Sequence, residues 1–410
     1  MVPNGWENKH LSEIASFSQG IQIPIENQYT FEGQNTCRFL RISDFVYQNE
    51  EPRFIDMPDS KFIVEEDDLS MIRYGSAGAG DLVRGLRGAI ANNLFRVIPN
   101  ELTVSKEYLW VYLRQEKVKD FLFSGSTSST MPAVSFKLVG KVPVAVPPLP
   151  EQRKIAQILS TWDRGIATTE KLIDASKQQK KALMQQLLTS KKRLVDPETG
   201  KAFEGDWEEV KFSTFGKCIR GVSYKPTQIS ENENENTIRL LRSTNIQEGK
   251  LNDKDLVILP REVVKPAQLM IKNDLAICMA NGSKLLVGKS APFNGNERAY
   301  TVGAFCAIFR PTKTYSHSLV QHVFNSAQYR HQLKVILAGS AINNLKGSDI
   351  ESMVIALPVN IKEQQKIASV LTAADKDIEL LEAKLAHLKQ EKKALMQQLL
   401  TGKRRVSLSS

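Results

Sequence analysis

An internal repeat limits the possible folds of this chain more than any other feature of the sequence. The sequence KKALMQQLLTSKKR at residues 180–193 recurs as KKALMQQLLTGKRR at residues 392–405, 212 positions later. At the same offset, EQRKIAQIL at residues 151–159 recurs as EQQKIASVL at residues 363–371. The ungapped alignment that contains both motifs covers 44 positions, of which 23 are identical. A repeat of this kind indicates a duplicated unit, so we expect two related halves.

Apolar residues in both copies recur at alternating steps of three and four, which is typical of the seam of a coiled coil. We expect helix pairing through Ile155, Leu159, Trp162, Ile166, Ile173, Leu183, Leu187, Ile367, Leu371, Ile378, Leu381, Leu385, Leu395 and Leu399. The first copy has a poorer seam, with Ser176 and Lys180 at core positions, and Lys392 interrupts the second. Heptads usually indicate dimerisation, but two copies in one chain favour pairing within the chain because the effective concentration is high.

The two helices predict how the chain divides. Prolines precede each helix, Asn360 and Glu363 are expected to form a variant capping box, and Gly402 suits a helix stop. A turn-rich linker, DPETGKAFEGDW, follows the first helix. The predicted parts are a first domain at 1–148, a helix at 149–193, a linker at 194–206, a second domain at 207–358 and a helix at 359–405. Strand-like runs at 37–42, 93–98 and 301–309 mix with helical runs at 106–123 and 318–337, so the predicted fold class is α+β, with two mixed α/β domains.

The net charge of +10 is concentrated in the helical repeats. Residues 150–193 contain 10 Lys or Arg against 4 Asp or Glu, and residues 362–405 contain 10 against 6. A polyanion is a plausible partner for such a chain, although two well-solvated helices account for the charge equally well. The sequence has no apolar stretch of membrane-spanning length and no secretory signal, which predicts a cytoplasmic protein without a membrane partner.

Recognisable catalytic motifs are missing from the sequence. The stretch at residues 282–290 has five residues between its glycines where a Walker A loop has four, and Pro292 interrupts the helix that should follow. No NPPY-like or DPPY-like tetrapeptide is present to hold a flipped adenine. The five histidines lack triad or metal-ligand spacing, and the four cysteines form no CxxC pair. We therefore expect a protein that is not an enzyme and that binds no cofactor or metal.

Two variable domains, each followed by a helix that begins EQxKIAxxL and closes KKALMQQLLT, resemble the specificity (S) subunit of type I restriction-modification systems. The segment PPLPEQRKIA at residues 147–156 and the repeated ALMQQLL are the most specific motifs. The resemblance implies two target-recognition domains that each read half of a split DNA site, and antiparallel helices with pseudo-two-fold symmetry. It also implies two methyltransferase (M) subunits, which supply S-adenosylmethionine and adenine-N6 chemistry, and two motor-nuclease (R) subunits.

DNA-reading residues cannot be transferred from that family because the recognition domains diverge. Base reading requires Arg, Lys, Asn, Gln or Ser on exposed loops. Glycine-rich loops at similar positions of the two domains supply the candidates Arg73, Tyr74, Ser76, Arg84, Arg87, Asn281, Ser283, Lys284, Lys289, Asn343, Asn344 and Lys346. Two other functions remain open at this point, namely a coiled-coil adaptor that does not touch DNA and a stand-alone DNA-binding regulator.

Overall fold

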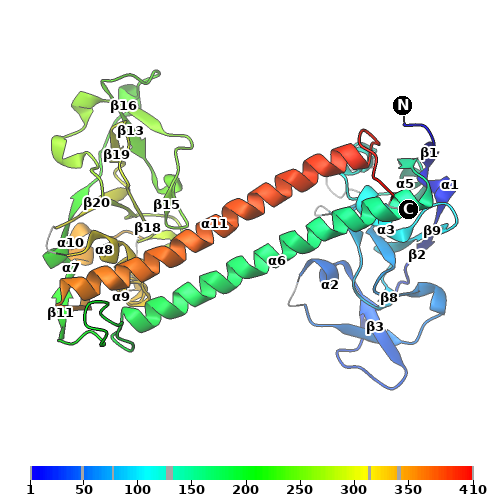
Figure 1. Cartoon of the computed structure of the whole chain (residues 1–410), viewed down its shortest axis with the longest axis horizontal. Coiled ribbons are helices and arrows are strands. Elements are labelled where there is room, and N and C mark those ends of the chain that lie inside the picture. The colour runs from blue at the N-terminus through cyan, green and yellow to red at the C-terminus, as the bar shows by residue number, and fades with distance from the viewer. Residues whose placement is uncertain are drawn as a thin grey trace. The chain divides into compact units, whose positions relative to one another are not determined.

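The computed structural model describes residues 2–47, 50–75, 78–125, 133–312, 315–338 and 343–408. The chain forms two compact units (Figure 1). Unit 1 contains Met1–Glu170 with Ala383–Ser410, and unit 2 contains Lys171–Glu382. The division falls inside the two long helices, so each unit holds one part of each helix.

The long helices are α6 (Leu149–Leu187) and α11 (Ile361–Leu399), each of 39 residues. Helix α6 begins at the predicted Leu149 but ends six residues before its predicted end at Arg193. Helix α11 likewise ends six residues before its predicted end at Arg405. The chain leaves both helices through the same turn, in which the residue at position 190 or 402 has a positive φ, 57° at Ser190 and 72° at Gly402. This observation confirms Gly402 as part of the helix stop.

The α11 start differs in part from the expected capping box. Asn360 does cap the helix, because its Oδ1 accepts the Lys362 backbone N–H at 2.9 Å. The carboxylate of Glu363 does not return to the cap residue. It accepts two hydrogen bonds from the Arg193 guanidinium instead, at 2.6 and 2.7 Å.

Ion pairs show that the two helices run antiparallel within each unit. In unit 1, Asp163 pairs with Lys392 at 2.5 Å and Glu170 pairs with Lys389 at 2.7 Å. In unit 2, Lys177 pairs with Glu382 at 2.9 Å and Lys180 pairs with Asp375. In both units the later α6 residue contacts the earlier α11 residue, which confirms antiparallel pairing within the chain. The lysines at core positions are therefore partners of aspartates on the opposite helix and are not flaws in the seam.

Burial along the seam is less uniform than predicted. The buried members are Ile155, Leu159, Ile173, Leu187, Ile367, Leu371, Ile378 and Leu399. The half-buried members are Trp162, Ile166, Leu183, Leu381, Leu385 and Leu395. A two-helix pair covers each helix from one side only, so most fully buried positions are those that also pack into the globular core of a unit.

In unit 1 the strands form a two-stranded sheet β1-β10 and two four-stranded sheets, β2-β9-β6-β7 and β4-β3-β8-β5. The strands are β1 (Glu7–His10), β2 (Ala15–Gln19), β3 (Thr36–Leu40), β4 (Arg53–Asp56), β5 (Ile63–Val64), β6 (Leu69–Ile72), β7 (Leu82–Val83), β8 (Gly88–Ile90), β9 (Leu94–Pro99) and β10 (Pro143–Val146). The helices are α1 (Leu11–Ile14), α2 (Ile42–Val46), α3 (Lys106–Tyr112), α4 (Glu116–Ser124) and α5 (Phe136–Gly140). Only β3 and β8 pair in parallel among these strands.

Unit 2 repeats this plan with the sheets β11-β21, β12-β20-β17-β18 and β16-β13-β19, and adds the hairpin β14-β15. The strands are β11 (Trp207–Lys211), β12 (Gly216–Arg220), β13 (Thr237–Leu241), β14 (Ile246–Gln247), β15 (Lys250–Leu251), β16 (Val257–Pro260), β17 (Leu275–Cys278), β18 (Ser290–Pro292), β19 (Tyr300–Val302), β20 (Cys306–Pro311) and β21 (Val354–Pro358). The helices are α7 (Phe212–Phe215), α8 (His317–Val323), α9 (Ala327–Ala338) and α10 (Gly347–Glu351). Here β13 and β19 form the parallel pair. The fold is thus the predicted α+β duplication.

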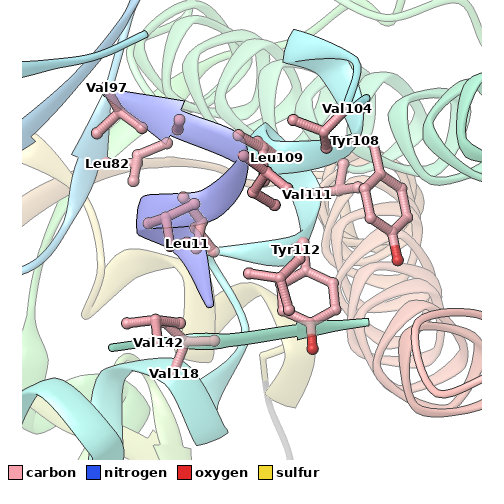
Figure 2. Close-up of a cluster of buried hydrophobic side chains, with 14 of the residues drawn as sticks. Leu11, Leu82, Val97, Val104, Tyr108, Leu109, Val111, Tyr112, Val118 and Val142 are labelled. Carbon is pink, nitrogen blue, oxygen red and sulfur yellow. The ribbon is translucent and has the colours of Figure 1, made fainter. Parts of the chain in front are cut away.

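The core of unit 1 joins its sheets to the long helices. Helix α3 carries Tyr108 and Tyr112 into a buried cluster with Leu11, Val97 and Val142 (Figure 2). The Tyr108 hydroxyl donates to the Ala145 carbonyl at 2.7 Å, so a polar group in the core is satisfied by β10, the strand that leads into α6.

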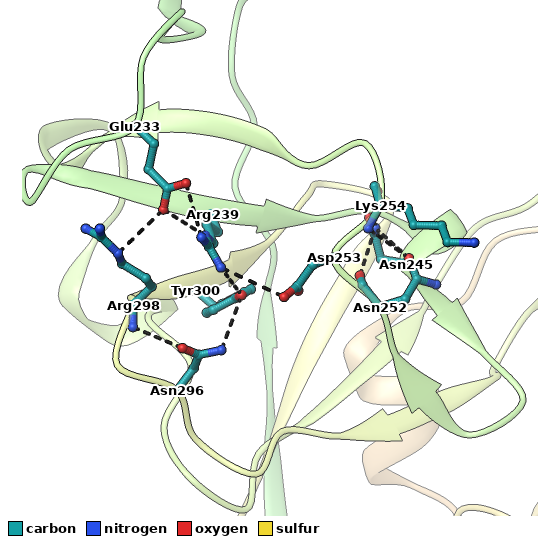
Figure 3. Close-up of polar contacts among 9 residues, drawn as sticks. All are labelled: Glu233, Arg239, Asn245, Asn252, Asp253, Lys254, Asn296, Arg298 and Tyr300. Atoms are coloured by element: carbon teal, nitrogen blue, oxygen red, sulfur yellow. Dashed lines mark hydrogen bonds and ion pairs between the residues drawn. The ribbon is translucent and has the colours of Figure 1, made fainter. Parts of the chain in front are cut away.

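A polar network in unit 2 stands beside its apolar clusters. The Arg239 guanidinium on β13 donates to Glu233 at 2.7 Å and to the Tyr300 hydroxyl at 2.7 Å (Figure 3). These contacts raise the pKa of Arg239 and lower that of Glu233, because each ion stabilises the charge of the other. The network ties the acidic segment at residues 231–235 to the β13-β19 pair.

The repeated Glu-Gln at the start of each long helix has a structural role in both units. Glu151 accepts two hydrogen bonds from Arg405 at 2.7 and 2.8 Å, as Glu363 does from Arg193. The neighbouring glutamines bind the N-terminal residue of a domain helix, since Gln152 accepts the Ser105 N–H at 2.8 Å and Gln364 accepts the Ser316 N–H at 3.3 Å. We call each Arg–Glu pair, with the backbone carbonyl that the arginine also binds, an end clamp.

Candidate nucleic-acid interface

Three chain segments meet beyond the end of β6 in unit 1. The Arg73 N–H donates to the Asn93 carbonyl at 2.8 Å, and the Val134 N–H donates to the Arg73 carbonyl at 3.0 Å. Tyr74 forms an isolated antiparallel bridge with Ala133. We call these residues (73–75, 91–93 and 133–134) the loop edge of unit 1.

The same arrangement occurs beyond the end of β17 in unit 2. The Met279 N–H donates to the Phe305 carbonyl at 2.8 Å, and the Leu345 N–H donates to the Met279 carbonyl at 2.8 Å. Ala280 bridges Asn344 in the antiparallel sense, as Tyr74 bridges Ala133. Residues 279–281, 303–305 and 343–345 are therefore the loop edge of unit 2. Both edges are built on the same pattern of backbone hydrogen bonds.

The loop edge of unit 1 carries hydrogen-bonding side chains. Arg73 donates to the Gln19 Oε1 at 2.6 Å, and its guanidinium lies 4.9 Å from the centre of the Tyr74 ring. The Gln19 amide in turn donates to the Asn92 carbonyl, and the Asn92 side chain donates to Gln22 at 3.3 Å. These groups are of the types that bind base edges and phosphates.

The loop edge of unit 2 has a different surface chemistry. Phe305 is 71% exposed, although its backbone is held by Met279. Asn343 donates to the Gly282 carbonyl at 2.9 Å, and Asn344 is exposed. Residues 279–289 and 343–348 contain three lysines and neither aspartate nor glutamate. This edge therefore combines an apolar side chain with amides in a positively charged neighbourhood.

The structure brings several predicted DNA-binding residues together on these edges. Arg73 and Tyr74 lie on the edge of unit 1, and Asn281, Asn343 and Asn344 lie on that of unit 2. Asn281 and Asn343 are joined directly, because the Asn281 N–H donates to the Asn343 carbonyl at 3.3 Å.

Other predicted residues have partners within the protein. Arg84 makes two 3.0 Å hydrogen bonds to Glu107 and lies 4.2 Å from the Trp110 ring centre, away from the loop edge. Arg87 pairs with Glu65 at 3.0 Å but remains largely exposed. Arg84 and Arg87 therefore do not join Arg73 in one cluster, because carboxylates on neighbouring elements hold them.

The remaining candidates surround the edge of unit 2 or cannot be placed. Ser283 and Lys284 are exposed beside it, and the Lys284 ammonium donates to the Leu337 carbonyl at 3.4 Å. Lys289 is half-buried, and Lys346 caps α10 through its backbone N–H, which donates to Asp349 at 2.8 Å. Ser76 lies outside the described residues.

Sequence reasoning missed Asn93 and Phe305, the two residues that flank the edges at equivalent positions. Phe305 and Asn93 are 212 positions apart, as the helix motifs are, but the equivalent Met279 and Arg73 are 206 apart, so one fixed offset would not have aligned the two edges. Their side chains differ completely, so residue similarity alone carried no signal.

The described residues do not form a candidate metal site, and the one histidine with a shifted pKa lies away from the loop edges. No group of three or more His, Cys, Asp or Glu within the described ranges could hold a metal ion. Burial lowers the pKa of His322 to about 4, but this imidazole packs against α11, with Thr372 at 3.0 Å, and not at a loop edge. Of the helices that the structure describes, none is both long and apolar enough to cross a membrane.

Comparisons with known proteins agree with this organisation. A family model described as the type I restriction modification DNA specificity domain matches residues 3–178 and 204–390. The MjaVIII specificity subunit of Methanocaldococcus jannaschii, a type I restriction enzyme subunit, is 26% identical over 99% of this chain and 94% of its own length. The EcoKI specificity subunit of Escherichia coli is 34% identical over 50% of this chain and 43% of its own length.

Solved structures support the fold. The S subunit of a type I restriction-modification system from M. genitalium superposes with a TM-score of 0.61 at 13% identity, covering 100% of this chain and 99% of that one. A chain from a study of type I complex assembly and conformational transition superposes with a TM-score of 0.57 at 18% identity, covering 98% and 100%.

The chain thus consists of two duplicated units, each with an equivalent loop edge and with one part of both paired helices. The chain belongs to the family of type I restriction-modification DNA specificity subunits. Its function is DNA sequence recognition for such a system, and its two specificity domains suit a target in two parts.

Proposed function

We propose that each loop edge reads one half of a bipartite DNA target, with residues 1–148 serving the first half-site and residues 207–358 the second. The observation that carries this proposal is the pair of edges with the same backbone and different side chains. A protein that read two copies of one half-site would need the same chemistry twice, whereas these edges carry Arg73 with Tyr74 in one unit and Phe305 with Asn344 in the other.

The partners follow from the family and from the chain's own composition. Two methyltransferase subunits bind the chain and supply S-adenosylmethionine for adenine-N6 methylation, and two motor-nuclease subunits add restriction. This chain contributes recognition and assembly but no catalytic group. Surplus lysines on α6 and α11 that lack an acidic partner are available for docking or for phosphate.

Methylome sequencing tests the proposal. The chain is co-expressed with the methyltransferase of its own system in a host that lacks adenine methylation at the target. We expect one bipartite motif with a fixed gap. Exchange of residues 1–148 for the corresponding domain of a relative is expected to change one half of the motif only.

Two results would contradict the proposal. A methylome without any new motif would favour the coiled-coil adaptor, which bridges partners without reading DNA. Loss of both half-sites after exchange of one domain, in a complex that still assembles, would show that the two units share one reading surface.

A further inference from the structure

Phe305 is an exposed apolar residue on the loop edge of unit 2. Its side chain is 71% exposed, while its carbonyl accepts the N–H groups of Met279 and Ala280 at 2.8 and 3.2 Å. The Cys306 N–H also donates to the Gly303 carbonyl at 2.8 Å, so a turn holds the residue directly before β20. The exposed aromatic ring of Phe305 is therefore held by a fixed backbone, as a well-positioned binding residue requires.

Unit 1 has asparagine at the same place. The Asn93 carbonyl accepts the Arg73 N–H at 2.8 Å, and the Leu94 N–H donates to the Ala91 carbonyl at 2.8 Å. Backbone geometry therefore matches at the two positions, and only the side chain differs. Because the fold is the same with either residue, the phenylalanine is not required to build the edge.

The surroundings of Phe305 favour a nucleic-acid partner. Lys284 and Lys346 are exposed on the segments that contain or follow the edge, where Asp349 is the nearest carboxylate in sequence, and Asn344 is exposed opposite Ala280. Positive charge around an apolar side chain complements a phosphate backbone with base edges between its strands. In the major groove of DNA the apolar group that a side chain can contact is the 5-methyl group of thymine.

We propose that Phe305 is a specificity-determining residue that contacts a thymine methyl group in the half-site read by unit 2. Its counterpart Asn93 offers no apolar side chain, and its Oδ1 is buried. This inference rests on the proposed function, since it requires that the loop edges bind DNA. Beyond the proposed function, the inference names the residue that distinguishes the two half-sites and the chemistry by which it does so.

The test uses the chain assembled with its methyltransferase and a duplex that carries the motif found by methylome sequencing. Each thymine of the second half-site is replaced in turn by deoxyuridine, which removes only the methyl group. For the wild-type complex we expect one replacement to weaken binding about fourfold, the effect of withholding one methyl group from burial.

The Phe305→Ala complex is expected to bind the thymine duplex at least about fourfold more weakly and to be insensitive to that uracil. Phe305→Leu, which keeps an apolar side chain, should retain part of the sensitivity. Two controls should behave as wild type on the uracil series. Ile271→Ala removes an apolar side chain that is 53% exposed before the start of β17, and Asn93→Ala alters the other edge.

Two outcomes would overturn the inference. Either no thymine of the second half-site is sensitive in the wild-type complex, or Phe305→Ala is as sensitive as the wild type. Both can occur in a complex that still methylates a bipartite motif, in which case only the role of Phe305 fails. A complex that recognises no motif would instead contradict the proposed function itself.

Discussion

The two end clamps use the same residues in different surroundings. In unit 1, Arg405 binds Glu151 and also donates to the Asn4 carbonyl at 2.9 Å, and the Trp6 indole N–H donates to Glu151 at 3.1 Å. In unit 2, Arg193 binds Glu363 and donates to the Gly205 carbonyl at 3.0 Å. The indole N–H of Trp207, the counterpart of Trp6, is buried without a partner among the described residues.

The two units therefore hold the ends of their long helices with different sets of contacts. The unit 1 clamp joins segments about 400 positions apart in sequence, so it depends on side-chain contacts, and Glu151 has a second donor in Trp6. The unit 2 clamp closes a short loop, because Arg193 and Gly205 are separated by 12 positions. Glu363 nevertheless lies 170 positions from Arg193, and the Trp207 indole N–H does not donate to it.

Removing the two arginines should have the largest and most unequal effect. Arg193→Ala leaves Glu363, whose side chain is 1% exposed, without its guanidinium partner, and we expect a cost of about 3 kcal/mol. Arg405→Ala should cost about half as much, because Trp6 still donates to Glu151. Hydrogen exchange measured by mass spectrometry can report the loss for each unit separately. Equal losses in the two variants would contradict the role given to Trp6.

Acid should destabilise unit 2 more than unit 1. His322 faces Thr372, Asp375 and Lys180, and burial lowers its pKa to about 4. The folded state keeps the imidazole neutral, whereas the unfolded state binds a proton below its ordinary pKa near 6.5. Stability is therefore lost as the pH falls from about 6.5 towards 4, by about 2 kcal/mol between pH 7 and pH 5.

The matching position in unit 1 supplies the control for that prediction. It is Val111, because Ser105 and Ser316 occupy equivalent helix starts that bind Gln152 and Gln364. His322→Val should remove about 2 kcal/mol of the pH dependence of unit 2, as measured by hydrogen exchange at the two pH values. An unchanged pH dependence would show that other groups cause the acid sensitivity.

Substitutions at Ser190 and Gly402, which follow the ends of α6 and α11, should change stability less and in opposite directions. Ser190 adopts φ 57°, which is strained for a residue with a Cβ, so Ser190→Gly should stabilise unit 2 by about 0.5 kcal/mol. Gly402→Ser should destabilise unit 1 by about 1.5 kcal/mol, because a Cβ there lies 2.3 Å from Pro3 Cγ. Thermal unfolding of the two variants provides the measurement, and a stabilising Gly402→Ser would contradict the close packing at Pro3.

The smallest effect is expected at the ion pairs between the helices. Asp163 faces Lys392 at 2.5 Å and Arg114 at 3.9 Å, whereas Asp375 faces Lys180 and a neutral His322. Asp163→Asn should therefore cost about 0.5 kcal/mol more than Asp375→Asn at neutral pH, a difference that 1 M salt should reduce. Equal costs at low salt would show that Arg114 contributes nothing.

Local sequence patterns predicted a large part of the fold. The heptad steps identified both long helices, and α6 begins at the predicted Leu149. Strand-like runs gave strands such as β3 and β9, and the helical run after residue 105 gave α3 and α4. Periodicity and turn residues act over a few neighbouring positions, so a single sequence is sufficient to reveal them.

The candidate site was predicted less completely. Glycine-rich loops pointed to Arg73, Tyr74 and the asparagines of unit 2, and the structure places them on the loop edges. Arg84 and Arg87 looked equivalent to Arg73 in sequence, but they pair with Glu107 and Glu65, whereas Arg73 donates to the Gln19 amide oxygen. Whether a charged side chain is free for a ligand depends on carboxylates distant in sequence, which a local pattern does not contain.

The sequence by itself determined that this protein is a duplication with two paired helices and two recognition domains, because repeats and heptads are properties of residue order. Tertiary structure alone determined which contacts the residues after each long helix make. Residues 188–193 and 400–405 leave their helices, and Arg193 and Arg405 reach buried glutamates 170 and 254 positions away. It also decided that Phe305 and Asn93 occupy one place in two edges. The physical reason is that burial and pairing are set by segments that meet only after the chain has folded.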